Sequence, residues 1–238
     1  MQDDLYQYPG KELELFSTAK NWKQYIARLI SPYIHGNVLE VGAGIGANTL
    51  VLFNNSVTSW LLLEPDKKFY DELSTLLDSK KIPAGCSAIN GYLGDLPPSA
   101  KFDTILYIDV LEHIKCDKCE IAAATNLLST GGKLIVLAPA HEHLMSPFDI
   151  AIGHYRRYSK NMLAGLVEDE RLQLLASIYV DSIGLFASMA NKYFLKQSYP
   201  GKKQIAFWNN WMIPLSRIID PILSYKCGKT IIAVWQKK

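Results

Sequence analysis

The sequence of 238 residues contains few cysteines and no long hydrophobic run. Its four cysteines are too few and too scattered for a disulfide framework in a chain of this length, so we expect reduced thiols in a cytoplasmic protein; they are Cys86, Cys116, Cys119 and Cys227. The absence of about 18 consecutive apolar residues excludes a conventional membrane-spanning helix. The first residues, MQDDLYQYPG, open with acids instead of a basic region and an apolar core, which argues against a signal peptide.

Three patterns that would indicate other classes of protein are also missing. Without low-complexity runs or solenoid repeats, the chain is expected to form one domain over residues 1–238. Without a nucleophile elbow or a triad pattern, covalent catalysis by a side chain is not indicated. The CDKC stretch at residues 116–119 has no second CxxC near it, so we interpret it as two thiols near the start of a helix instead of a zinc site.

Positive charge is concentrated near the carboxyl end of the chain. Residues 187–238 hold nine Lys or Arg and one acid, Asp220, whereas the rest holds sixteen Lys or Arg and twenty-two acids. Aromatic and aliphatic residues lie between these lysines, so residues 205–226 are a candidate for peripheral contact with a membrane surface. A phosphorylated acceptor, or a solvated face over a core-packing helix, would also explain the pattern. We expect no nucleic-acid partner and either a monomer or a homodimer.

Apolar runs of strand length alternate with helical patterns along most of the chain. Helices are predicted over residues 13–33, 45–55, 66–80, 119–132 and 161–170, and strands within 37–42, 58–66, 86–96, 102–110, 133–140, 172–182 and 229–237. The stretch between the last two strands is expected to be helical and broken by Pro200, Pro214 and Pro221. Unbroken apolar strands between helices indicate a parallel sheet with both faces covered. The expected fold is therefore α/β: a Rossmann-like doubly wound sheet, mostly parallel, with an antiparallel C-terminal strand.

A glycine-rich stretch, EVGAGIGANT at residues 40–49, lies between the first strand and the following helix. Glycine suits a sharp turn against which a ligand packs, and the helix start offers free amides. With Ala47 as its last position the stretch also fits a dinucleotide fingerprint. Glu40 favours another ligand, because a carboxylate there would repel a pyrophosphate and attract an ammonium group.

The E-x-G-x-G-x-G pattern resembles the cofactor motif of class I S-adenosylmethionine-dependent methyltransferases of the type 11, 12 or 23 kind, and the match extends over residues 35–140. The resemblance implies that Glu64 in LLLEPD binds both ribose hydroxyls, although an NAD enzyme would use it the same way. It implies that Asp95 and Leu96 flank the adenine. The cofactor-binding residues it implies are Glu40, Gly42, Ala43, Gly44, Gly46, Asn48, Glu64, Pro65, Asp95, Leu96, Asp109 and Val110. Residues 1–34 would be a helical cap, 35–140 the cofactor-binding core and 141–238 the substrate side.

The DVLEHI stretch after the fourth strand raises the question of a metal. In ubiquinone-pathway O-methyltransferases and small-RNA 2′-O-methyltransferases, a similar E-x-x-E-H motif binds a divalent ion. Here Asp109 replaces the first Glu, and a Glu or His can instead cap the helix. We expect no metal; the candidate ligands, should one bind, are Asp109, Glu112, His113 and His141.

The segment HEHLMSPFDIAIGHYRRYSKNML resembles a stretch found in a subset of these enzymes that modify glycans, lipids or secondary metabolites. It follows the fifth strand and is expected to cross the cofactor mouth. Its arginines can bind a carboxylate or phosphate, and Tyr155 and Tyr158 can wall a ring. Alternatively, Arg157 pairs with a core acid and Ser159 caps a helix. The candidate catalytic residues are His113, His141, His154, Arg156, Arg157 and Tyr158, with His143 as a further candidate base.

The leading hypothesis is methyl transfer from S-adenosylmethionine, with S-adenosylhomocysteine as product, to a small-molecule, glycan or lipid-linked acceptor. Such an enzyme mainly aligns the acceptor and excludes water, with a base where the acceptor is weakly acidic. Two alternatives stay open. One is a methyltransferase-like cofactor-binding module without turnover, and the other is an NAD-dependent oxidoreductase.

Overall fold

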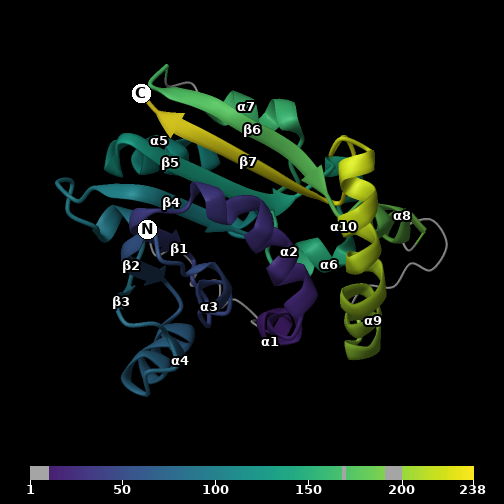
Figure 1. Cartoon of the computed structure of the whole chain (residues 1–238), viewed down its shortest axis with the longest axis horizontal. Helices are drawn as coiled ribbons and strands as arrows, with labels where there is room; N and C mark the ends of the chain where they lie inside the picture. The colour runs from purple at the N-terminus through teal and green to yellow at the C-terminus, as the bar shows by residue number, and fades with distance from the viewer. Residues whose placement is uncertain (1–10, 168–169, 191–199) are drawn as a thin grey trace.

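The computed structural model describes residues 11–167, 170–190 and 200–238, which form a seven-stranded sheet with helices on both faces (Figure 1). The strand order is β3-β2-β1-β4-β5-β7-β6, and β7 runs antiparallel to both of its neighbours while the others are parallel. The predicted doubly wound sheet with an antiparallel C-terminal strand is therefore confirmed. The strands are β1 (Gly36–Val41), β2 (Val57–Glu64), β3 (Cys86–Asn90), β4 (Phe102–Ile108), β5 (Leu128–Pro139), β6 (Leu172–Val180) and β7 (Thr230–Lys237).

The described helices are mostly short. They are α1 (Lys11–Ser17), α2 (Lys20–Ile30), α3 (Thr49–Leu52), α4 (Lys67–Asp78), α5 (Asp117–Leu127), α6 (Pro147–Ala151), α7 (Lys160–Leu166), α8 (Ser182–Ala190), α9 (Lys202–Phe207) and α10 (Ile213–Ile222). Single turns join them at η1 (Ser31–Tyr33), η2 (Leu93–Asp95), η3 (Leu111–His113), η4 (Glu142–Leu144) and the π-helical η6 (Trp208–Met212). No helix of the described residues is long and apolar enough to cross a membrane.

The strands are buried on both sides because each face of the sheet has its own core. Successive strand residues point to opposite faces, so Leu39 packs with α5 and α7 while its neighbour Val38 packs with α2 and α10. This arrangement explains why the strands are unbroken apolar runs. It also leaves the carboxyl ends of β1, β2 and β4 as the place where polar side chains can gather.

The N-terminal cap consists of two helices instead of the single helix predicted over residues 13–33. The chain turns at Thr18 and Ala19, where the Thr18 hydroxyl donates to the Leu15 carbonyl over 2.8 Å. A side chain that competes for backbone carbonyls in this way favours a helix end. Residues 1–10 of the predicted cap lie outside the described residues. They are the MQDDLYQYPG stretch that was compared with a signal peptide.

Two other predicted helices are shorter at their carboxyl ends. The helix expected over 119–132 ends at Leu127, because Leu128 pairs with Phe102 and already belongs to β5. Pairing in the sheet thus overrides the expected glycine stop. The helix expected over 161–170 ends at Leu166, and residues 168–169 lie outside the described part.

The segment after Pro200 is one helical rod over residues 202–222, so the prediction that Pro214 and Pro221 break it is wrong (Figure 1). Pro214 lies in the first turn of α10, directly after the π-helical turn η6. A π-turn shifts the hydrogen-bond register and accommodates a residue that has no N–H. Pro221 lies one residue before the end of α10, so the helix continues past it by a single residue.

Cys116 and Cys119 are joined in a disulfide, so the expectation of reduced thiols is wrong for this pair. They lie at the start of α5, where residues three apart share a helix face. Their Cα atoms are 5.3 Å apart, within the range that a disulfide spans. Cys86 and Cys227 are free thiols. A cytoplasmic location stays a prediction.

Candidate functional site

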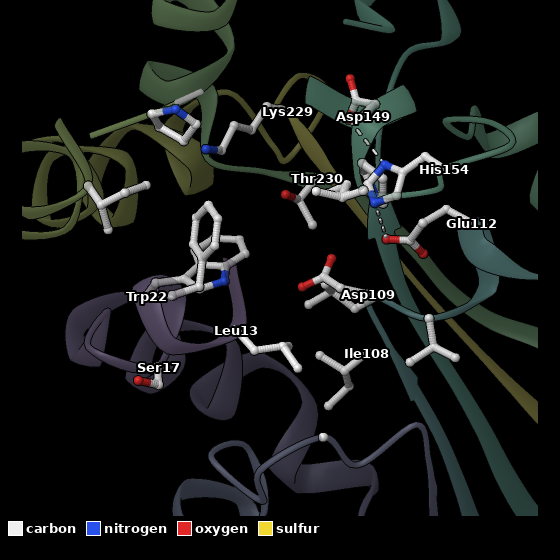
Figure 2. A pocket seen from close by; sticks show the side chains of 18 of the residues that line it. Leu13, Ser17, Trp22, Ile108, Asp109, Glu112, Asp149, His154, Lys229 and Thr230 are labelled. Carbon is white, nitrogen blue, oxygen red and sulfur yellow. Dashed lines mark hydrogen bonds and ion pairs between the residues drawn. The ribbon is translucent and has the colours of Figure 1, made fainter. Parts of the chain in front are cut away.

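The carboxyl ends of the parallel strands border a cavity of about 1,100 Å³ (Figure 2). The loop after β1 and the ends of β2 and β4 line one side of it. The other walls come from α1 and α2, residues 144–157, α8, α9 and η6, and the start of β7. A doubly wound sheet binds its ligand at this edge.

The glycine loop adopts backbone conformations that other residues avoid. Gly42, Gly44 and Gly46 have φ values of 65°, 56° and 72°, in the left-handed region. A Cβ on Gly42 would lie 2.6 Å from Val110 Cγ2, and one on Gly46 would lie 2.9 Å from Leu73 Cδ1. Gly42 and Gly44 line the cavity together with Ala43. The loop is therefore a tight cradle that exposes its backbone to a ligand.

Glu64 ends β2 and presents a carboxylate to the cavity. Its Oε2 accepts the Gly44 N–H over 2.7 Å, and its Oε1 accepts the Asp66 N–H over 2.9 Å. Each oxygen keeps a further acceptor position. Burial raises the pKa of Glu64, although the two N–H groups oppose that shift. Pro65 lines the cavity beside it, so this turn fits a ligand that offers hydroxyl donors.

Glu40 lies below the loop and is not among the cavity-lining residues. Its Oε2 accepts hydrogen bonds from Thr49 Oγ1 over 2.6 Å and from Trp60 Nε1 over 2.9 Å. Burial raises its pKa to about 7, although these two bonds oppose the shift. Glu40 thus ties the glycine loop to α3 and β2, and its contact with a ligand's ammonium stays a prediction.

Asp109 follows β4 and faces the cavity (Figure 2). Its φ of 54° is uncommon for a residue other than glycine, and its N–H donates to the Leu137 carbonyl over 2.9 Å, which holds the turn. The side chain is exposed to the cavity, with protein around it. Desolvation by that protein raises its pKa to about 6, although His154 and Lys23 oppose the shift. Val110 lines the cavity next to it.

Glu112 is fully buried, and among the described residues neither of its carboxylate oxygens has a hydrogen-bond partner. Its Oε1 is 3.8 Å from His154 Nε2, and the His154 ring lies between Glu112 and Asp149 (Figure 2). Burial, together with the nearby Asp109, raises the pKa of Glu112 well above its ordinary value. Because an unpaired buried charge is costly, we expect this carboxyl to be neutral in the metal-free protein.

Glu112, His113 and His154 also form a group that could hold a metal ion, since their donor atoms lie within 4.8 Å of one another. One carboxylate and two imidazoles suit a transition metal. Burial lowers the pKa of His113 to about 3, and His154 adds to that shift, so the His113 ring is neutral as a ligand must be. His141, the other histidine named as a ligand, lies elsewhere, with Nε2 2.9 Å from the Gly228 carbonyl oxygen.

The glycine loop, Glu64 and the turn after β4 all lie within the part of the chain that matches a known family. Residues 39–136 match a family model described as a methyltransferase domain. Over these residues the chain carries a methyltransferase domain of the class I, S-adenosylmethionine-dependent kind. A geranyl diphosphate methyltransferase in complex with S-adenosylmethionine has a TM-score of 0.66 at 10% identity, covering 97% of this chain and 91% of that one. An S-adenosylmethionine-dependent methyltransferase from Clostridium acetobutylicum has a TM-score of 0.58 at 12% identity, over 96% and 95% of the two chains.

The same fold also occurs in a protein named for another reaction. The [4+2]-cyclase SpnF has a TM-score of 0.62 at 14% identity and covers 96% of this chain and 94% of its own. No curated protein matches the chain by sequence. Likeness at these identities shows the fold, and the choice of acceptor must be argued from the site.

The GHYRRYS segment of this methyltransferase is pinned by Asp149, which is 1% exposed. Arg157 donates to both Asp149 oxygens, over 3.1 and 2.8 Å, and His154 Nδ1 lies 3.1 Å from Oδ1. The Ser146 N–H and hydroxyl also donate to Oδ2. Burial alone would raise the pKa of Asp149, but the hydrogen bonds from His154 and Arg157 outweigh it and lower the pKa. His154 and Arg157 line the cavity.

Arg156 and Tyr158 point away from the methyltransferase cavity. Arg156 forms an ion pair with Asp117 and donates to the Lys115 carbonyl over 2.8 Å. The Tyr158 side chain is fully buried, and its hydroxyl oxygen lies 3.1 Å from the Leu111 carbonyl oxygen and 3.0 Å from an Asp117 carboxylate oxygen, to either of which it can donate. Both side chains contact Asp117 and so anchor the segment to α5, and neither lines the cavity in which an acceptor was predicted to contact them.

Other predicted residues of the methyltransferase lie outside the cavity lining. His141 stacks on Tyr179 with ring centroids 4.8 Å apart, and His143 packs beside His141. Asp95 is exposed and accepts the Tyr92 N–H over 2.7 Å, whereas Leu96 is buried in the core. A contact of Asp95 or Leu96 with adenine stays a prediction. Ser159 is the N-cap of α7, which confirms the alternative that this serine caps a helix.

Sequence reasoning missed several cavity residues of this methyltransferase. Lys23 lines the cavity and donates to Asn48 Oδ1 over 3.2 Å; burial lowers its pKa, although Asp109 opposes the shift. Lys229 lines the far side, 3.5 Å from Asp181 Oδ2 and over the Trp208 ring at 4.1 Å. Lys23 lies in a predicted helix and Lys229 at the start of a predicted strand. No motif in either segment indicates a ligand-binding residue.

Proposed function

We propose that this methyltransferase transfers a methyl group to an amphipathic acceptor, either a small molecule or a lipid-linked one. The observation that carries the proposal is a single cavity shared by the glycine loop and by a second, mostly apolar wall. Its volume of about 1,100 Å³ is just above that of typical ligand sites, which enclose roughly 300–1,000 Å³. A cavity of that size can hold a cofactor and an acceptor together.

The cofactor side is chemically matched to S-adenosylmethionine. Glu64 has acceptor positions left for ribose hydroxyls, and the glycine loop leaves backbone exposed to the cavity. Lys23 offers a cation for the amino-acid carboxylate, and Asp109 offers an anion for the ammonium group. When bound, the cofactor supplies an electrophilic methyl group on its sulfonium. The protein then has to hold the acceptor in line with that methyl group and keep water out.

The acceptor side combines apolar walls with a cation. Phe16, Trp22, Met212 and other large side chains line it, and Lys229 lies beside the Trp208 ring. Burial lowers the pKa of Lys229, although Asp181 opposes the shift. An acceptor with an apolar body and an anionic group would match both features. Lipid-linked phosphates and aromatic carboxylates have that chemistry.

His154 is the proposed general base for an acceptor hydroxyl or amine. Asp149 receives the Nδ1–H over 3.1 Å, which leaves the lone pair on Nε2, on the side of Glu112. A carboxylate that fixes an imidazole in this tautomer prepares the other nitrogen to accept a proton. In this role Nε2 takes up the acceptor's proton, and the Asp149 carboxylate beside Nδ1 stabilises the imidazolium that forms.

The test combines calorimetric binding with transfer of a labelled methyl group. We expect S-adenosylmethionine to bind the wild type, and NAD not to bind. We expect Glu64→Ala to weaken cofactor binding, and His154→Gln to lower turnover while binding is kept. Cofactor binding without methyl transfer to any amphipathic acceptor would favour a non-catalytic module. Binding of NAD in place of S-adenosylmethionine would overturn the proposal.

A further inference from the structure

One face of the helical rod over residues 202–222 carries large apolar side chains that the described protein does not cover. They recur every three or four residues and so lie along one side of the rod; this apolar rod face consists of Phe207, Trp211, Leu215, Ile218 and Ile222. Trp211 is 71% exposed and Ile222 is 75% exposed. A contiguous row of such side chains marks an interaction surface, unlike single exposed apolar residues.

The rod cannot turn this face inward, because its other side is fixed to the core. Asp220 is fully buried and accepts the Tyr25 hydroxyl over 2.7 Å and the Asp181 N–H over 2.7 Å. Trp208 donates its Nε1–H to Asp181 over 2.7 Å, and Asn209 accepts the Trp22 N–H over 3.1 Å. The apolar rod face therefore lies on the outside of the described residues.

The exposed charges of the chain segment that forms this face have one sign. Residues 200–238 contain seven Lys or Arg and a single acid, Asp220, which is fully buried. Lys202 and Lys203 lie exposed at the start of the rod, Arg217 lies on α10, and Lys226 lies exposed just after it. A helix with bulky apolar residues on one face and basic residues at its margins has the properties of an interfacial membrane helix.

The apolar rod face is also continuous with the mouth of the cavity. Lys203, Gln204 and Phe207 are exposed at the surface and line the cavity as well. A surface bound there would cover the entrance through which an acceptor reaches the site. In Figure 1 the rod formed by α9 and α10 stands on the side of the molecule where α8 also lies, away from β3.

We propose that the apolar rod face docks this methyltransferase onto an anionic lipid membrane, with the rod parallel to the surface. Trp211, Ile218 and Ile222 enter the headgroup region, and the lysines contact lipid phosphates. Docking needs neither cofactor nor turnover. It can therefore be tested even if the proposed reaction is wrong.

The experiment is co-sedimentation of the full chain with vesicles of phosphatidylcholine alone or mixed with phosphatidylglycerol. We expect the wild type to sediment with the mixed vesicles and to be released by salt. Trp211→Gln/Ile218→Gln should bind at least about ten-fold more weakly. Lys202→Gln and Lys226→Gln should each weaken binding about five-fold.

The control is Ile89→Gln/Leu174→Gln, which replaces two exposed apolar side chains, 39% and 44% exposed, on the two edge strands β3 and β6. It should bind like the wild type, and thermal melting should show that both double variants are folded. Equal binding by the rod variant and the wild type would overturn the proposal. So would a wild type that stays in the supernatant, or light scattering showing a dimer that the rod variant dissociates, since a second copy would then cover the face.

Discussion

Replacing Asp149 with asparagine removes the anion that holds the GHYRRYS segment against the cavity. The substitution keeps the shape of the side chain, but turns one carboxylate oxygen into an NH₂ donor. In the wild type, Asp149 Oδ2 accepts hydrogen bonds from Ser146 and Arg157. Its Oδ1 accepts one from Arg157 and faces His154 Nδ1. In either orientation of the asparagine amide, its NH₂ group will face at least one N–H or O–H group of Ser146, Arg157 or His154.

The cost follows mainly from the unpaired Arg157. Removing one partner of a buried ion pair typically costs about 3–5 kcal/mol. The Arg157 side chain is 14% exposed and keeps a 3.3 Å hydrogen bond to the Ala140 carbonyl, so we expect the low end, about 3 kcal/mol. For a domain of this size that corresponds to a fall in melting temperature of about 6–12 °C.

Differential scanning calorimetry tests this value, with the exposed, surface-paired Asp71→Asn as a control that should change stability by less than about 0.5 kcal/mol. Because the folded-state pKa of Asp149 is lowered, its stabilisation is complete above the ordinary carboxyl pKa of about 4 and is lost as the pH falls through the folded value. The gap between wild type and variant should therefore shrink in acid. A variant that melts within about 1 °C of the wild type at pH 7 would refute the account of the segment.

Three further substitutions give separate checks. Gly42→Ala should cost about 2 kcal/mol, because its φ is 65° and its Cβ would meet Val110, whereas Gly94→Ala, with open space, should melt like the wild type. Burial raises the pKa of Glu40 to about 7 from an ordinary 4.5. The stability of the wild type should therefore fall as the pH rises from 4.5 to 7, and Glu40→Gln should remove most of that dependence. Glu112→Gln should change the unfolding free energy at neutral pH by less than about 1 kcal/mol, and a larger loss that EDTA reproduces in the wild type would indicate a bound metal.

The sheet was predictable because its causes are local in sequence. Buried parallel strands require continuous apolar runs, and crossovers require helices between them, so periodicity alone gave the fold class. Element ends were less predictable, since they depend on tertiary partners. Leu128 leaves its helix because it pairs with Phe102, and Pro214 stays in a helix because a π-turn precedes it.

The placement of Gly42, Glu64 and Asp109 in one cavity was also predictable, because they lie at strand ends that meet at one edge of the sheet. The opposite wall of the cavity was not predictable. In GHYRRYS, only the contacts with Asp149 and Asp117 separate His154 and Arg157, which face the cavity, from Arg156 and Tyr158, which do not. Contacts with residues elsewhere in the sequence decide which of these charged or polar side chains is structural.

A crystal structure of the complex with S-adenosylhomocysteine tests the central claim most directly. We predict the ribose hydroxyls on Glu64, the amino-acid end between Lys23 and Asp109, and the sulfur facing the part of the cavity walled by His154 and Lys229. A ligand bound outside this cavity, or one whose sulfur faces away from His154, would contradict the account.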